Sequence, residues 1–182
     1  MIKGYTYYNN IKIFQHKNFQ IVFKKFFDIY KPRLILEIGT AQGGLTKFLS
    51  DISKTKILTY DPYTSPDFEN YNIEHIQKDI FGDLDMLSEM IQNIGLTLVL
   101  CDGGDKIKEF KTFAPIIKSG DFIFGHDYAR SLNYFKKYIK GNEWDWLELN
   151  REDIEEDITN NNLYDFMSED FNSVVWGSFR KI

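Results

Sequence analysis

The chain has 182 residues, 43% of them hydrophobic and 27% charged, which is the composition of a globular protein that can bury a core as one domain. Its formal net charge is −5 and its lysines are scattered, so the sequence lacks the basic stripe that binding to a nucleic acid polymer requires. No stretch approaches the roughly 20 apolar residues of a membrane-spanning helix, so we expect no membrane partner.

Cysteine usage and the N-terminal sequence predict the cellular compartment. Cys101 is the only cysteine, which excludes an internal disulfide, and residues 1–14 lack the continuous apolar segment of a signal peptide. Both features are typical of the reducing cytosol, so we expect a cytoplasmic protein. Cys101 itself lies in an apolar stretch, where a small buried side chain is a better interpretation than a nucleophile.

The first half of the chain predicts helices that alternate with strands. Apolar residues recur at helical spacing from Phe19 to Tyr30, and Pro32 prevents that helix from continuing. The stretch RLILEI, residues 33–38, is apolar on both faces, as in a strand buried between two helical layers. The elements predicted next are a helix over 45–52, a strand over 56–60 that Asp61 and Pro62 stop, and a short strand over 73–77.

The same alternation continues in the second half. A helix over 84–94 is closed by Gly95, which can adopt the left-handed conformation at a helix end. A strand over 96–100, a helix over 107–117, a strand over 121–125 and a helix over 132–139 follow. Because strands alternate with helices, the sequence predicts a parallel sheet.

The C-terminal part has a different pattern. Residues 144–149, WDWLEL, and 173–179, SVVWGSF, are aromatic and strand-like, and we predict that they pair as antiparallel edge strands. The acidic, Asn-rich segment 151–170 between them has little helical periodicity, which favours a solvated loop, a helix start or a lid over the site. No repeat or long linker divides the chain. We therefore predict one domain over 1–182, with an N-terminal helical extension over 1–31 that either caps the pocket or mediates a homodimer.

The stretch LILEIGTAQGG joins a buried strand to a helix through a glycine-rich turn. In open parallel sheets ligands bind at the carboxyl ends of the strands, and Gly39 and Gly43 would let the backbone approach a ligand closely. Glu37, near the end of the strand, would accept hydrogen bonds from a cationic group or a hydroxyl. The alternative is a tight turn in which the glycines provide positive φ angles and Glu37 bridges to a nearby backbone amide.

Two more acidic residues end the next predicted strands. Asp61 lies about 22 residues after Gly39, at a place where an acidic side chain can bind both hydroxyls of a ribose, and Asp79 ends the third strand. Each aspartate alone is more often a solvated turn residue. Acidic residues at three successive strand ends, however, indicate the rim of one pocket.

These residues also carry a family resemblance. LEIGTAQGG resembles the first motif of class I S-adenosylmethionine-dependent methyltransferases, and LEIGTAQGGLTKFL with FAPIIKSGDFIFGHDY is similar to their cephalosporin-hydroxylase-like group, which includes sugar O-methyltransferases. The resemblance covers Leu34 to about Tyr128. It implies an α/β fold, a Rossmann-like, doubly wound, seven-stranded and mostly parallel sheet with a C-terminal antiparallel strand pair.

The resemblance also implies how S-adenosylmethionine would be bound. The residues that it assigns are Glu37, Gly39, Thr40 and Gly43 around the methionine part, Asp61 at the ribose hydroxyls, and Asp79 with Ile80 at the adenine. The family often has a serine after the glycine pair for the methionine carboxylate. This chain has Leu45 there, so Thr46 is the candidate substitute.

Two further aspartates match the metal-dependent members that the chain resembles. There, acids at these strand ends bind a divalent cation that polarises the acceptor oxygens, and Asp102 and Asp127 fall on those positions; Asp102 also borders the predicted cofactor pocket. His126 stands where an acid is common, so we expect it to be a third ligand, to magnesium or to a softer ion such as manganese, or else a general base. The alternative is that both aspartates cap local turns.

Three functions follow from these patterns. The first is an S-adenosylmethionine-dependent O-methyltransferase for a small-molecule or sugar hydroxyl, with catalytic residues His126 and Asp127. The second is a nucleotide-binding or interaction protein that has the same fold without catalysis. The third, an NAD-dependent oxidoreductase, is disfavoured because the third glycine of its motif and a separate substrate domain are missing and because Glu37 would repel the pyrophosphate.

Overall fold

A computed structural model describes residues 4–182 of the chain. Its elements are, in chain order, β1 (Thr6–Tyr8), β2 (Ile11–Ile13), α1 (Phe19–Ile29), β3 (Leu34–Ile38), α2 (Gly44–Ser53), β4 (Lys56–Tyr60), β5 (Ile73–Ile76), η1 (Ile80–Gly82), α3 (Leu84–Asn93), β6 (Thr97–Cys101), α4 (Lys106–Ile116), β7 (Phe122–Gly125), β8 (Tyr128–Ala129), α5 (Leu132–Tyr134), η2 (Phe135–Ile139), β9 (Leu149–Asn150), α6 (Arg151–Asn160), β10 (Leu163–Asp165), α7 (Ser168–Asn172) and β11 (Gly177–Lys181).

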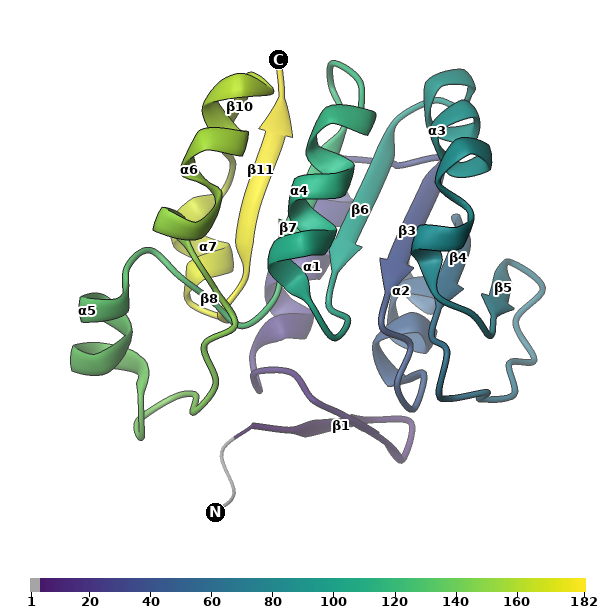
Figure 1. Cartoon of the computed structure of the whole chain (residues 1–182). Coiled ribbons are helices and arrows are strands. Elements are labelled where there is room, and N and C mark those ends of the chain that lie inside the picture. The colour runs from purple at the N-terminus through teal and green to yellow at the C-terminus, as the bar shows by residue number, and fades with distance from the viewer. Residues whose placement is uncertain (1–3) are drawn as a thin grey trace.

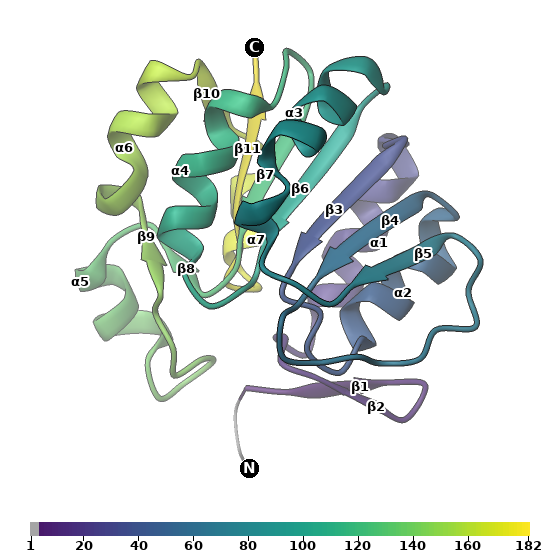
Figure 2. The same cartoon turned by 45° about the vertical axis from the view of Figure 1, so that its right-hand side comes forward.

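The centre of the fold is a seven-stranded sheet with the strand order β10-β11-β7-β6-β3-β4-β5. Strands β3 to β7 are parallel, whereas β11 runs antiparallel to both β7 and β10. Helices α3, α4 and α6 cover one face of the sheet and α1, α2 and α7 the other (Figures 1 and 2). This arrangement confirms the predicted doubly wound α/β fold, including the C-terminal antiparallel pair.

Only one strand of that pair was predicted from the sequence: β11 overlaps the predicted strand 173–179, whereas 144–149 is not its partner. Residues 144–149 contribute only the start of β9, which pairs with β8 outside the main sheet, and the partner of β11 is β10, within the acidic segment 151–170. The same segment also forms helix α6, so of the interpretations that the sequence left open for it, the helix start is the one that the structure shows. The helix is stabilised at its start by a capping box between Asn150 and Asp153, and its buried apolar residues are only Ile154 and Ile158. With so few apolar residues, the helical periodicity of this segment is weak in the sequence.

The N-terminal region and one short helix also differ from prediction. The expected helix is α1, but an antiparallel hairpin of β1 and β2 comes before it, around a turn in which Asn9 and Asn10 both have positive φ. The helix predicted over 132–139 is a three-residue α-helical turn followed by a five-residue π-helix. In Figure 1 the hairpin crosses below the carboxyl ends of the parallel strands, where the site lies.

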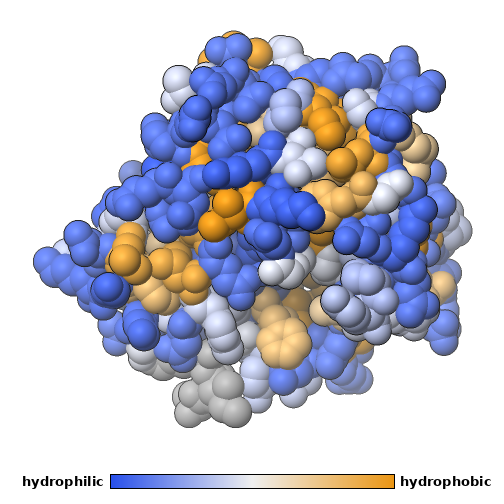
Figure 3. Space-filling view, viewed as in Figure 1, coloured by the Kyte–Doolittle hydropathy of each residue, from blue (hydrophilic) through white to orange (hydrophobic). Residues whose placement is uncertain are grey.

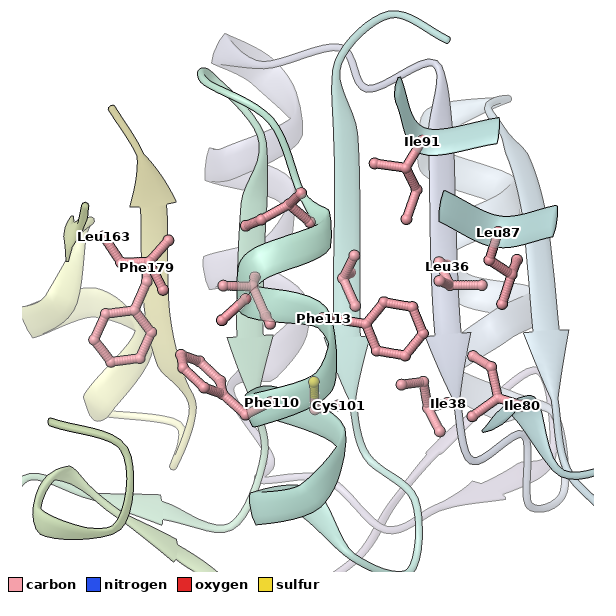
Figure 4. Close-up of a cluster of buried hydrophobic side chains, with 14 of the residues drawn as sticks. Leu36, Ile38, Ile80, Leu87, Ile91, Cys101, Phe110, Phe113, Leu163 and Phe179 are labelled. Atoms are coloured by element: carbon pink, nitrogen blue, oxygen red, sulfur yellow. The ribbon is translucent and has the colours of Figure 1, made fainter. Parts of the chain in front are cut away.

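The core has two parts because the sheet is covered on both faces. Along β3, Leu36 and Ile38 belong to the cluster beneath α3 and α4 that Figure 4 shows, whereas Ile35 belongs to an aromatic cluster beneath α1 and α2. Side chains alternate along a strand, so Glu37 shares the face of Ile35. This parity decides where Glu37 can act.

The outer surface in the view of Figure 1 is mostly hydrophilic, with separate small hydrophobic areas (Figure 3). Within residues 4–182, none of the helices combines the length and the apolar character that crossing a bilayer requires.

Candidate functional site

A cavity of about 240 Å³ lies where the strand order reverses, between the carboxyl ends of β3 and β6. One wall is the turn between β3 and α2, residues 39–42, and the opposite wall follows β6 and β7. The residues lining it are Gly4, Lys12, Ile13, Phe14, Gln15, Gly39, Thr40, Ala41, Gln42, Gly44, Leu45, Asp102, Lys106, His126, Asp127, Trp144, Trp146 and Glu148. Ligand pockets commonly measure about 300–1,000 Å³, so this cavity is small. Its lining includes both charged and aromatic side chains.

The structure brings Asp102, His126 and Asp127 together. Asp102 follows β6 and the other two follow β7, and one ligand atom of each lies within 4.8 Å of the others. His126 Nδ1 is 2.8 Å from Asp102 Oδ1 and 3.6 Å from Asp127 Oδ1. Burial opposes protonation of His126, but the charges of Asp102 and Asp127 outweigh it and raise the pKa of the imidazole.

Backbone and side-chain contacts fix Asp127. Its φ of 52° lies in the left-handed region, which aspartate tolerates better than most residues, and its carbonyl accepts hydrogen bonds from the amides of Glu148 and Leu149. Trp144 Nε1 donates to Asp127 Oδ1 at 2.5 Å. Burial works against ionisation of this carboxyl, but the nearby His126 and Lys106 charges lower its pKa.

Lys106, which sequence reasoning missed, lies beside this cluster. Its Nζ is 2.6 Å from Glu148 Oε2, 3.0 Å from the Gly103 carbonyl oxygen and 3.2 Å from Asp127 Oδ2. The side chain is only 5% exposed. Its position just before the predicted helix 107–117, in the connection that follows the strand ending near Asp102, was the available signal, because that connection lies at the same end of the sheet.

The cluster of Asp102, His126 and Asp127 is the place where the family resemblance implied a divalent cation. The spacing of the three ligand atoms suits a metal, but each carboxylate oxygen of Asp102 and Asp127 already has a nitrogen neighbour, from Gln15, His126, Trp144 or Lys106. The Lys106 ammonium is also 3.9 Å from Asp102 Oδ1. A divalent ion at these oxygens would have to displace those nitrogen neighbours and would lie next to the Lys106 ammonium.

Glu37 connects structural elements and does not face the cavity. Its side chain is fully buried, and Oε2 accepts hydrogen bonds from Thr46 and Thr59 at 2.5 Å each. Oε1 has no partner among the described residues. Burial raises the pKa of Glu37 to about 8, so the carboxyl is largely neutral at pH 7. Thr59 is also 2.7 Å from the hydroxyl of Thr40, so Glu37 positions a residue that lines the cavity.

The other predicted cofactor residues are divided between the cavity and its surroundings. Gly39 and Thr40 line the cavity, whereas Gly43 lies behind it, and a Cβ atom there would come within 2.7 Å of the Phe68 ring. Gly39 has a φ of 93°, and a Cβ atom would lie 2.3 Å from the Asp102 carbonyl oxygen, so only glycine fits. The predicted carboxylate ligand Thr46 instead donates to Glu37.

Asp61, Asp79 and Ile80 are not among the lining residues. Asp61 accepts hydrogen bonds from the amides of Ala41, Tyr63 and Thr64, and although burial opposes it, these bonds lower the pKa of Asp61. Asp79 is exposed and accepts from the Phe81 amide, and Ile80 is part of the core. The predicted ribose and adenine positions are therefore separate from the cavity in this arrangement.

The N-terminal segment closes the cavity, which is one of the two roles that the sequence left open for it. Gln15 Nε2 donates to Asp102 Oδ2 at 2.7 Å, and Gln15 Oε1 accepts from Trp176 Nε1 at 2.7 Å. Phe14 and Trp146 line the cavity and remain 46% and 44% exposed. Together they leave an aromatic opening next to the acid and histidine cluster.

Comparison with known proteins places this geometry in a known fold. No model of a protein family matches the sequence, and no curated protein matches it. A solved structure of CmcI with Mg and S-adenosylmethionine has a TM-score of 0.70 and 17% identity, covering 97% of this chain and 76% of that one. Another CmcI structure, without ligand, has a TM-score of 0.69, 15% identity and the same coverage.

A third similar structure is a candidate caffeoyl-CoA O-methyltransferase from Staphylococcus aureus, with a TM-score of 0.58 and 14% identity over 94% of this chain and 87% of that one. The similarity spans nearly the whole chain, including the N-terminal region and the acidic segment that resembled nothing in sequence. At these identities it establishes the fold, which is that of class I methyltransferases.

Proposed function

We propose that the protein is an S-adenosylmethionine-dependent methyltransferase that acts on a hydroxyl of a small molecule. The observation that carries the proposal is the cavity itself: the glycine turn at Gly39 and the cluster of Asp102, His126 and Asp127 face one space at the strand-order reversal. In the similar CmcI structure, S-adenosylmethionine is bound to a protein of the same fold.

The charges of the cavity suit this methyl donor. S-adenosylmethionine carries a sulfonium and an amine, both cationic, and Asp102, Asp127 and Glu148 line the cavity with carboxylates, which outnumber the cationic Lys106 and His126 beside them. Gly39 and Thr40 would hold the methionine end, because the turn allows close approach of its backbone. The pyrophosphate of NAD would meet the same carboxylates and be repelled. When bound, S-adenosylmethionine supplies an activated methyl group.

The chain's own contribution is to align the acceptor and to take its proton. A hydroxyl is a poor nucleophile until its proton is removed, and alignment of the two reactants supplies much of the rate. Asp102 holds Nδ1 of His126, and among the described residues Nε2 of His126 is buried without a partner. We assign the neutral form of His126, oriented by Asp102, as the general base, with Asp127 beside it; because the pKa of the imidazole is raised, this form predominates only at a pH above that raised value. Because Nε2 is buried, the side chains around it would have to move for an acceptor to bring its hydroxyl to this nitrogen.

The aromatic opening favours a flat or cyclic acceptor. Phe14 and Trp146 are each about half exposed at the cavity, and Lys12 adds a cation at the same rim. Such rings can pack against an aromatic scaffold or the apolar face of a sugar. A small-molecule or sugar hydroxyl is therefore the substrate class that we propose.

Titration calorimetry tests the cofactor assignment. S-adenosylmethionine and S-adenosylhomocysteine should bind, and NAD should bind at least roughly tenfold more weakly because of charge repulsion. Thr40→Val removes the hydroxyl at the cavity and should weaken binding, whereas Thr55→Val, far from the cavity, should not. Tighter binding of NAD than of S-adenosylmethionine would overturn the proposal.

Asp61 needs a separate test, because its oxygens bind backbone amides in the structure. We keep the proposal that it holds the ribose, which requires residues 62–64 to release one of its oxygens. Asp61→Asn should then weaken the binding of S-adenosylmethionine. Asp67→Asn, at an exposed position in the same segment, should leave that binding unchanged. Equal affinities would remove Asp61 from the binding site while leaving the methyltransferase proposal intact.

Turnover separates an enzyme from a protein that only binds the nucleotide. Purified protein, labelled S-adenosylmethionine and a panel of phenolic and glycosylated hydroxyl compounds should give a labelled product. His126→Gln should lower kcat by roughly 10²–10⁴, the contribution typical of a general base. Full activity of this variant would exclude His126 as the base.

A further inference from the structure

We propose that the Lys106 ammonium is the built-in cation of this site and that it replaces a divalent metal. The proposal deepens the function proposed above, since it concerns the same cluster. Its test, however, requires neither a methyl donor nor an acceptor.

The ammonium is held as a bound cation would be. It has three N–H donors, and three oxygens surround it: Glu148 Oε2 at 2.6 Å, the Gly103 carbonyl oxygen at 3.0 Å and Asp127 Oδ2 at 3.2 Å. The side chain is 5% exposed. Because the lysine is buried and each of its three N–H donors has an oxygen acceptor, its ammonium is a fixed part of the site.

The carboxylates that a metal would need are already bound to nitrogen atoms. Asp102 faces His126 through Oδ1 and Gln15 through Oδ2, and Asp127 faces Trp144 through Oδ1 and Lys106 through Oδ2. A magnesium ion bonds carboxylate oxygens at about 2.1 Å. Such an ion on Asp127 would lie next to the ammonium, in a site of low exposure where like charges repel strongly.

The loop before Lys106 fixes the geometry. Glu109 accepts hydrogen bonds from the amides of Gly103 and Asp105, at 3.1 and 3.2 Å, which aligns the Gly103 carbonyl with Lys106. A Cβ atom on Gly103 would lie 2.3 Å from Glu109 Oε1, so a larger residue would change this loop. The position of the lysine is thus built into the start of α4.

The fixed ammonium supplies, next to Asp102 and Asp127, the positive charge that a metal ion on these residues would supply. It favours the ionised acceptor, because positive charge near a hydroxyl lowers the pKa of that hydroxyl. Unlike a metal, it is permanently attached. The site would therefore work without a metal supply.

The test measures binding of Mn²⁺ alone to the whole protein, by calorimetry and by electron paramagnetic resonance. The wild-type protein should bind no Mn²⁺ at the cluster. Lys106→Gln removes the charge and keeps a donor for Gly103, so it should bind Mn²⁺ roughly tenfold or more tightly than wild type. The added Asp102→Asn change should abolish that gain. Lys106→Arg, which keeps the charge, and the exposed Lys111→Gln should behave as wild type.

Each outcome decides the proposal. Wild-type binding of Mn²⁺ that Asp102→Asn abolishes would overturn it, and so would a folded Lys106→Gln variant that binds no more Mn²⁺ than wild type. Near-ultraviolet circular dichroism identifies a variant that does not fold. In that case the wild-type and Lys106→Arg measurements still decide, since metal binding by either would overturn the proposal. Failure here leaves the S-adenosylmethionine calorimetry unaffected, so the two proposals fail separately.

Discussion

Gln15 Nε2 donates a hydrogen bond to Asp102 Oδ2 at 2.7 Å, joining two residues that are 87 positions apart in the chain. The same amide accepts a hydrogen bond from Trp176 Nε1, so one buried side chain connects the N-terminal segment, the carboxyl end of β6 and the residue before β11. The cluster at Asp102 is therefore assembled from three distant parts of the sequence.

Replacing Gln15 by leucine should destabilise the protein by about 2–4 kcal/mol, because it leaves the buried indole N–H of Trp176 and one oxygen of the partly buried Asp102 without their partner. Denaturant unfolding measures the loss. The exposed Gln77→Leu provides the control and should change stability by less than about 0.5 kcal/mol. An equally small effect at Gln15 would mean that the bridge does not form in solution.

Glu37 should make stability fall with rising pH. Its pKa is raised to about 8 in the folded chain from 4.5, by burial first and by the charges of Asp102 and Asp61. Between these values the unfolded chain is ionised and the folded chain binds a proton, so this group lowers stability by up to roughly 1.4 kcal/mol per pH unit. Below about pH 4.5 the contribution is fully present, and above about pH 8 no more is lost.

Glu37→Gln is uncharged at every pH and should remove that slope. Compared with wild type, it should gain stability progressively from pH 5 to pH 8, as measured by urea unfolding at each pH. The exposed Glu69→Gln is the matched control and should keep the wild-type slope. Parallel curves for wild type and Glu37→Gln would show that Glu37 is ionised in the folded protein at neutral pH.

Gly44 and Ile13 should be coupled, because the hairpin packs directly on the first turn of α2. A Cβ atom on Gly44 would lie 2.4 Å from Ile13 Cγ1, which has little freedom to move because Ile13 is buried. Gly44→Ala should displace the hairpin from the cavity and weaken S-adenosylmethionine binding, and Ile13→Ala should restore part of the loss. A double-mutant cycle in binding free energy measures the coupling, which we expect at about 0.5–3 kcal/mol. Purely additive effects would contradict the contact.

Phe26 should contribute heavily to stability through the aromatic cluster between α1 and the sheet. Its ring is fully buried and lies 5.1 Å from the Phe122 ring and 5.4 Å from the Phe124 ring, centroid to centroid. Phe26→Ala should lower the free energy of unfolding by about 3–5 kcal/mol. Ile21→Ala, on the same helix but 69% exposed, should lower it by less than about 1 kcal/mol. Similar losses of unfolding free energy for both variants would mean that α1 does not direct Phe26 into the core and Ile21 toward solvent.

The sequence by itself determined the parallel sheet and the end of it at which the site lies. Apolar strands such as residues 34–38 alternate with amphipathic helices, and local spacing suffices for that pattern because each element carries its own periodicity. The acidic and histidine residues that follow β6 and β7 could be placed together because parallel strands end at one edge. That expectation holds for Asp102, His126 and Asp127.

Tertiary structure alone decided which polar groups face the cavity. Glu37 was expected at a ligand, but strand parity directs it beneath α2 to Thr46, and Asp61 is satisfied by backbone amides of its own loop. Lys106 becomes the central cation only because Glu148, from a segment 42 residues later, completes its set of oxygens. Likewise, β11 pairs with β10 because helix α6, which comes directly before β10, brings that segment to the edge of the sheet. Contacts between distant segments have no local signature, whereas periodicity does.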